Sequence, residues 1–190
     1  DRIKVTGIPI RPEFSQPLNR YEILKNLSFN SSKPVLLIVG GQLRHEELLK
    51  IVSGIRKKDG SAQFIIIAGR DKILRRKLEN SELKRTPTAR IFGLVPNMEE
   101  FMTASDLILS KAGGSTVAEC LAKNLPMIVY RTIPGQEEDN VNYLIGNKVG
   151  IKVKNTKEII ETTVDLFSQP DKLEKMKANC RRIQKPNSAE

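Results

Sequence analysis

Short apolar runs alternate along this chain with stretches of helical periodicity, and this alternation limits the fold more than any other feature. The run at 34–40 reads PVLLIVG and the run at 63–69 reads QFIIIAG. Four shorter runs follow, at 89–93, 106–110, 126–130 and 149–153. Strands that are apolar throughout and separated by helices indicate a parallel sheet covered on both faces. We therefore predict an α/β fold with a Rossmann-like parallel sheet.

The segments between these runs have the spacing of amphipathic helices. We expect helices at 43–55, 71–80, 97–105, directly after Gly113-Gly114, and at 135–147, 156–168 and 171–184. Residues 1–33 contain three prolines and a polar run, and we expect them to form an interdomain linker and lead-in with one short helix. Residues 34–190 would then be a single ligand-binding domain. Because the sequence opens on DRIKVTGIPI without Met or a leader, we expect a fragment of a longer chain.

The formal net charge of +10 comes partly from the basic stretches 72–90 and 172–185. These stretches are compatible with solvated helix faces, with an anionic membrane surface or with nucleic acid. Aromatic residues make up only 5% of the chain and none interrupts the basic stretch 72–90, which argues against single-stranded nucleic acid. No apolar run approaches the roughly 20 residues that span a bilayer.

Cys120 and Cys180 lie far apart inside predicted helices. They are typical of buried thiols in a reducing compartment, and a disulfide framework is not expected. The chain has one histidine and no Cys-x-x-Cys pair, so we predict no zinc site.

The stretch SKAGGSTVAECLAKNLPMIVY, residues 110–130, places Gly113 and Gly114 at the start of a helix. Two interpretations remain open from these residues. Thr116 and Glu119 have the spacing of a capping box, which would only close the helix end. Alternatively, the free N–H groups of the first turn, with Ser115 and Thr116, would bind an anion.

Other phosphate motifs are absent. The chain has neither G-x-G-x-x-G nor the P-loop pattern, and it contains no Asp-x-Asp triplet. If a diphosphate binds, we expect the helix N-terminus to hold it without a divalent metal ion.

A second polar group occurs in PGQEEDNVNYLIGN, residues 134–147. Gln136 and Asn140 share a helix face, with Glu137 beside them. Taken alone, this pattern favours a capped, solvated helix start, and the alternative is a set of amide and carboxylate groups for sugar hydroxyls.

Four stretches together resemble the C-terminal, donor-binding half of the family 28 glycosyltransferases, in their diacylglycerol glycosyltransferase branch. They are VTGIPIRPEF (5–14), LLIVGGQ (36–42), the stretch 110–130 and IPGQEEDNVNYLI (133–145), with PNSA near the C-terminus as a weaker fifth. The resemblance implies the second domain of a two-domain GT-B enzyme that transfers a hexose, with inversion, from UDP-glucose or UDP-galactose to diacylglycerol.

The resemblance also implies roles for individual residues. Phe92, Gly93 and Val95 would hold the uracil, with Arg70 near the base. The diphosphate would face Gly113, Gly114, Ser115 and Thr116, and Glu119 would accept the ribose hydroxyls. The hexose would contact Gln136 and Glu137, with Asn140 nearby, and Gly40 and Gly41 would border the cleft.

No residue of this chain is a convincing catalytic base, so we expect the base and the lipid-acceptor site in a preceding domain. No cofactor and no nucleic-acid partner are expected. The full-length protein would lie at the cytoplasmic side of a membrane, peripherally bound, and the fragment itself would be soluble. The alternatives are the donor-binding subunit of a split glycosyltransferase, a UDP-sugar epimerase-like domain, and a basic module that binds membrane or nucleic acid.

Overall fold

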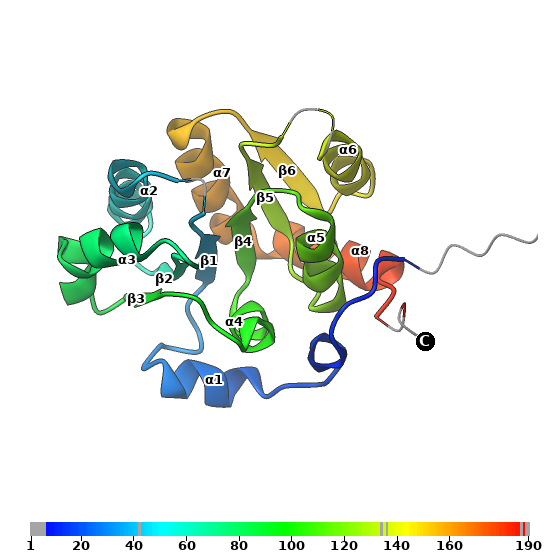
Figure 1. Cartoon of the computed structure of the whole chain (residues 1–190), viewed down its shortest axis with the longest axis horizontal. Coiled ribbons are helices and arrows are strands. Elements are labelled where there is room, and N and C mark those ends of the chain that lie inside the picture. Colours follow the sequence, from blue (N-terminus) through cyan, green and yellow to red (C-terminus); the bar gives the residue numbers. More distant parts are fainter. Residues whose placement is uncertain (1–6, 42, 134, 136, 187, 189–190) are drawn as a thin grey trace, which may run out of the picture.

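The computed structural model describes residues 7–41, 43–133, 135, 137–186 and 188 (Figure 1). One parallel sheet lies at its centre, with the strand order β3-β2-β1-β4-β5-β6. The strands are β1 (Val35–Val39), β2 (Gln63–Ile67), β3 (Ala89–Phe92), β4 (Leu107–Ser110), β5 (Met127–Tyr130) and β6 (Gly150–Val153). The predicted fold class is confirmed, and each strand lies within the run predicted for it.

Helices connect consecutive strands, as the periodicity predicted. They are α1 (Arg20–Asn26), α2 (His45–Lys58), α3 (Lys72–Glu79), α4 (Met98–Ala104), α5 (Gly114–Ala122), α6 (Glu138–Gly146), α7 (Thr156–Ser168) and α8 (Pro170–Ile183), with short 3₁₀ turns η1 (Pro12–Phe14) and η2 (Glu82–Arg85). Local chemistry sets several starts, because Asn19, Asp71 and Asn155 accept hydrogen bonds from the first-turn N–H groups of α1, α3 and α7.

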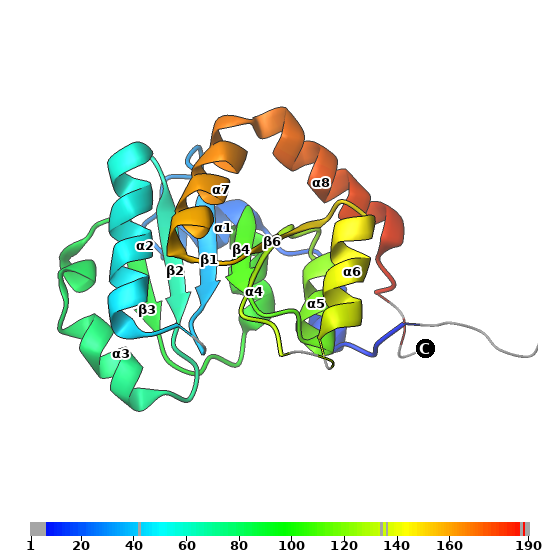
Figure 2. The same cartoon turned by 90° about the horizontal axis from the view of Figure 1, so that it is seen from above.

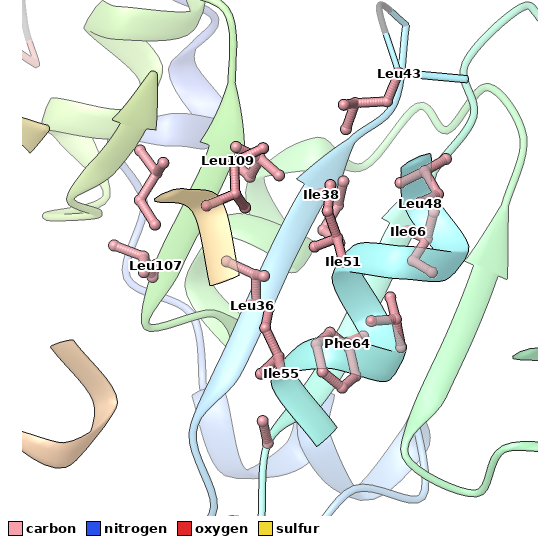
Figure 3. Close-up of a cluster of buried hydrophobic side chains, with 14 of the residues drawn as sticks. Leu36, Ile38, Leu43, Leu48, Ile51, Ile55, Phe64, Ile66, Leu107 and Leu109 are labelled. Atoms are coloured by element: carbon pink, nitrogen blue, oxygen red, sulfur yellow. The ribbon is translucent and has the colours of Figure 1, made fainter. Parts of the chain in front are cut away.

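The strands are buried on both sides because alternate side chains enter two different cores. Leu36 and Ile38 of β1 point toward α2, where they meet Leu48 and Ile51 (Figure 3). Val35 and its neighbours of the same parity face the opposite core, which α1, α4, α5 and α6 cover. A sheet buried on both faces gives the near-continuous apolar strands seen in the sequence.

The described part of the lead-in packs against this second core. Phe14 and Leu24 are fully buried, and Ile10 and Phe29 are nearly so. Arg20 of α1 pairs with Asp106 at 2.8 Å. Residues 7–33 therefore contribute to the core of the domain, while the boundary at residue 33 stays a prediction.

Both cysteines are buried free thiols, as predicted. Burial raises the pKa of Cys120 well above its usual value and raises that of Cys180 to about 12. Among the described helices, none combines the length and apolarity that crossing a bilayer requires.

The strand order places one crevice at the centre of the sheet. In the order of the sheet, β2 and β3 follow β1 toward one edge. Strand β4 lies on the other side of β1, and β5 and β6 follow it toward the opposite edge. The connections leaving β1 and β4 therefore turn to opposite sides at the carboxyl edge. Ligands of open α/β sheets bind at such a switch point.

Candidate functional site

A cavity of about 250 Å³ opens at this switch point. It is lined by Val39, Gly41, Leu43, Leu109, Ser110, Lys111, Thr116 and Tyr130. These residues come from the carboxyl ends of β1, β4 and β5 and from the first turn of α5. Of the residues predicted to form the site, Gly41 and Thr116 lie in the lining.

The first turn of α5 has unused backbone donors. The helix begins at Gly114 after the N-cap residue Gly113, and no side chain caps it. The first helical bond runs from the Val117 N–H to the Gly113 carbonyl at 2.9 Å, so within the described chain the N–H groups of Gly114, Ser115 and Thr116 have no acceptor. The capping-box interpretation is wrong. It requires Thr116 to precede the helix as the N-cap residue, but Thr116 is the third residue of α5.

Lys111 and Glu137 bring opposite charges to the same place. Lys111 Nζ lies 3.0 Å from Glu137 Oε1. A Cβ on Gly113 would lie 3.8 Å from Lys111 Cε and 3.9 Å from both Glu137 Oε1 and Thr116 Oγ1. The ammonium group, the carboxylate and the uncapped helix start therefore surround Gly113.

Glu137 is almost fully buried, with 3% of the residue exposed. Its carboxylate accepts the Ile133 N–H at 3.1 Å as well as the lysine. Asn140, in the first turn of α6, donates to the Ala112 carbonyl at 2.8 Å. Both side chains thus hold the loop between β4 and α5, and their predicted contacts with a hexose stay predictions.

Glu47 connects the two walls of the cavity. Its carboxylate accepts the Arg44 N–H at 2.8 Å, the Tyr130 hydroxyl at 3.3 Å and Arg131 Nη2 at 2.7 Å. Burial alone would raise the pKa of Glu47, but the Arg44 N–H and the charges of Arg131 and Arg44 outweigh it and lower this pKa. Arg131 has a positive φ of 54°, a conformation that strains residues other than glycine. The ion pair with Glu47 helps to hold this turn.

Glu119 lies outside the cavity lining, further along α5. It is half-buried, and no hydrogen bond or ion pair reaches its carboxylate within the described part of the chain. Burial raises its pKa, the charge of Arg11 opposes this shift, and Glu99 adds to it. Arg11 itself pairs with Glu99 of α4 at 2.9 Å. Glu119 therefore faces the start of α4 and has acceptor capacity to spare.

The predicted uracil loop also borders α4. Phe92 packs on Phe101 of α4 with ring centroids 4.7 Å apart, and Val95 contacts the same core. Gly93 is buried beneath Arg75, whose Nη1 would lie 2.9 Å from a Cβ at that position. A side chain at residue 93 would displace this guanidinium.

The remaining predicted residues lie at the same carboxyl edge. Gly40 is buried, and its N–H donates to the Ile67 carbonyl at 2.8 Å. Arg70 is exposed in the turn after β2. Gln136 lies outside the described residues. Among the residues that the structure does describe, no group of acidic, histidine and cysteine side chains has the arrangement of a metal site.

Comparison with known proteins identifies the family. The Glycosyltransferase family 28 C-terminal domain matches residues 35–190. The chain belongs to glycosyltransferase family 28. It is 31% identical over 188 residues to a processive diacylglycerol beta-glucosyltransferase of Bacillus subtilis, covering 99% of this chain and 49% of the relative. It is 33% identical over 196 residues to monogalactosyldiacylglycerol synthase 3 of Arabidopsis thaliana, covering 98% and 42%.

Solved structures agree with the fold. WaaG, a glycosyltransferase involved in lipopolysaccharide biosynthesis, matches with a TM-score of 0.72 at 18% identity, over 96% of this chain and 53% of that one. The complex of S. aureus MnaA with UDP matches with a TM-score of 0.67 at 13% identity, over 86% and 43%. The chain spans about half the length of the curated relatives it matches. It is a glycosyltransferase domain of the GT-B type, as the resemblance implied.

Sequence reasoning missed four polar residues at or beside the cavity of this candidate site: Lys111, Tyr130, Arg131 and Glu47. Lys111 and Tyr130 had a usable signal, because each lies where an apolar strand ends at the binding edge. Arg131 had the same signal, because it directly follows the run at 126–130. Glu47 had none, because it precedes Tyr130 by 83 positions and only the fold brings the two together.

Proposed function

We propose that this domain binds a UDP-hexose donor, UDP-glucose or UDP-galactose, for inverting hexosyl transfer to diacylglycerol in glycolipid synthesis. One observation carries the proposal: an uncapped helix start and the Lys111 ammonium group converge beside the cavity at the switch point. Both features favour an anion, and a diphosphate offers two charged groups to them.

The chain's own groups would stabilise the leaving diphosphate. As the bond from the sugar to the diphosphate breaks, negative charge grows on the phosphate oxygens. The N–H groups of Gly114, Ser115 and Thr116 and the charge of Lys111 would face that position. The pair of Lys111 with Glu137 and the hydrogen bond from Asn140 to Ala112, which hold this loop, support the proposal. We propose that this arrangement acts without a divalent ion.

With the diphosphate at the start of α5, the positions of the ribose, the uracil and the hexose follow from the elements around it. Glu119, with its unpaired carboxylate, would accept the ribose hydroxyls, and the loop at Phe92, Gly93 and Val95 would take the uracil. The hexose would lie toward the cavity, near Gly41 and Tyr130. The acceptor and the base that deprotonates its hydroxyl group would come from the other half of the enzyme.

Calorimetric titration of the chain tests this function. UDP, UDP-glucose, UDP-galactose, UDP-N-acetylglucosamine and GDP are compared, each with magnesium and with EDTA. We expect UDP and its hexoses to bind in EDTA and GDP to bind much more weakly. Loss of binding in EDTA would contradict metal independence, and equal binding of GDP would contradict the uridine assignment.

Lys111→Met provides the matching variant. A hydrogen bond to a charged group contributes about 1.5–3 kcal/mol, so we expect UDP affinity to fall roughly 10- to 100-fold. Lys152→Met, on the edge strand β6, removes the same charge away from the cavity and should leave the affinity unchanged. If both variants bind UDP like the parent, Lys111 is not a phosphate ligand.

A further inference from the structure

An open hollow separates α2 from α3 on the outside of the domain. Its volume is about 620 Å³, and it is lined by His45, Glu46, Lys72, Ile73, Arg76, Lys77 and Asn80. Three of these residues are cationic, and Glu46 is the one carboxylate among them. We call Lys72, Ile73, Arg76 and Lys77 the α3 basic face, because their helical spacing places them on one side of α3.

The cationic side chains of this face have few partners. Among the described residues, the side chains of Lys72, Arg76 and Lys77 form no hydrogen bond or ion pair, and all three are exposed. The pKa of Glu46 is lowered first by a backbone hydrogen bond, and the charges of His45 and Lys77 add to this effect. Ile73, in their midst, is 72% exposed, more than any other large hydrophobic side chain of the described chain. Contact of this large apolar side chain with water is unfavourable, and Ile73 does not contribute to the core.

The second basic helix of the molecule lacks this combination. On α8, Lys172 pairs with Asp165 at 2.7 Å, and Lys177 pairs with Asp106 and Glu174, each at 3.0 Å. No large hydrophobic side chain of α8 is exposed. Both helices carry cations, so charge alone does not distinguish them. What distinguishes α3 is the exposed Ile73 among its cations.

The α3 basic face also has a defined place relative to the proposed donor site. Helix α3 begins five residues after β2 ends, at the carboxyl edge of the sheet. In Figure 2 it lies at the end of the sheet toward which β1 and β2 point. The cavity opens at this same edge, so a surface bound by α3 would lie beside it.

We propose that the α3 basic face docks onto an anionic phospholipid surface. The headgroup phosphates lie against Lys72, Arg76 and Lys77, and Ile73 enters the boundary between headgroups and acyl chains. Cations near an anionic leaflet and an apolar side chain in its interface both favour binding. The purpose of this docking rests on the proposed function, because a lipid acceptor has to reach the donor from a membrane, but the binding itself does not.

Vesicle co-sedimentation of the whole chain tests the proposal. The vesicles are pure phosphatidylcholine or phosphatidylcholine with about 30% phosphatidylglycerol, a fraction that gives the anionic surface charge of a cytoplasmic leaflet. We expect binding to the anionic vesicles only, weakening as salt is added. The triple variant Lys72→Gln, Arg76→Gln, Lys77→Gln should lose roughly 100-fold in affinity, and Ile73→Ser roughly 10-fold.

The matched control removes the same charge from α8, with Lys175→Gln, Arg181→Gln and Arg182→Gln, and it should bind like the parent. An equal loss in this control would overturn the proposal in favour of unspecific charge attraction. Full binding by Ile73→Ser, together with equally tight binding of a soluble polyanion, would overturn it in favour of nucleic acid. UDP titration of each variant separates the two proposals, since α3 variants should bind UDP normally whether or not they bind vesicles.

Discussion

At the scale of single residues, Glu119 has a carboxylate that the fold itself leaves without a hydrogen-bond donor among the described residues. Its carboxylate is half-buried on α5, and no described residue donates to it, so burial raises its pKa above the usual 4.5. A charged group without partners in a partly desolvated position destabilises the folded chain. Two ribose hydroxyls would supply the missing donors.

We therefore predict that Glu119→Gln stabilises the protein while it weakens UDP. A carboxyl whose pKa is raised on folding loses stability as the pH rises from its unfolded to its folded pKa. The variant should unfold at a higher urea concentration than the parent at about pH 7, and this advantage should vanish at about pH 3, where the carboxyl is protonated in both states. UDP affinity should fall roughly 10- to 100-fold.

Urea denaturation at the two pH values and calorimetry with UDP check these expectations together. Glu138→Gln, an exposed carboxylate at the start of α6, is the control for a change of charge. A variant that is less stable than the parent at neutral pH, with unchanged UDP affinity, would falsify the assignment of Glu119 to the ligand.

At the scale of elements, close packing between α6 and β6 decides where glycine is required. Gly150 begins β6 under α6, and a Cβ there would lie 2.9 Å from Leu144 Cβ and 3.4 Å from the Met127 carbonyl oxygen. Leu144 is fully buried, so neither atom can move away easily. Gly146, the last residue of α6, has nothing within 4 Å of such a Cβ.

Substitution by alanine should therefore change the free energy of unfolding in opposite directions at Gly150 and Gly146. We expect Gly150→Ala to lower the free energy of unfolding by about 1–3 kcal/mol, because the core is overpacked. Gly146→Ala should raise it by about 0.4–1 kcal/mol, because alanine restricts the unfolded chain and adds no clash. Chemical denaturation of both variants gives the comparison. Equal stability of the two would show that α6 adjusts its distance from the sheet.

At the scale of the whole molecule, one carboxylate joins elements from both layers at the edge opposite the site. Asp106, between α4 and β4, accepts the Val35 N–H at 3.0 Å, Arg20 Nη2 at 2.8 Å and Lys177 Nζ at 3.0 Å. These partners belong to β1, α1 and α8. This network lies at the end of the sheet opposite the proposed donor site.

We expect Asp106→Ala to lower the stability of the fold without changing its affinity for UDP. Removing one member of a partly buried charge network leaves the two cations unpaired, and we expect a loss of about 3–5 kcal/mol in the free energy of unfolding. UDP affinity should remain that of the parent under conditions where the variant is folded. Asp165→Ala breaks an exposed pair with Lys172 and should cost no more than about 1 kcal/mol. A large drop in UDP affinity by folded Asp106→Ala would show that the two edges are coupled.

The sequence alone determined the class of fold and the positions of its elements, since apolar strands and helical periodicity are local patterns that hydrophobic burial enforces. It also located the Gly113-Gly114 helix start, because the pattern lies within a few neighbouring residues. Only the tertiary structure decided that this start is uncapped, which depends on where α5 begins, and that Lys111 pairs with Glu137. The sheet order likewise brings Glu47 to Tyr130 and Arg131 across the cavity. Such contacts join residues far apart in the chain, and their geometry follows from how the strands are ordered rather than from any local preference.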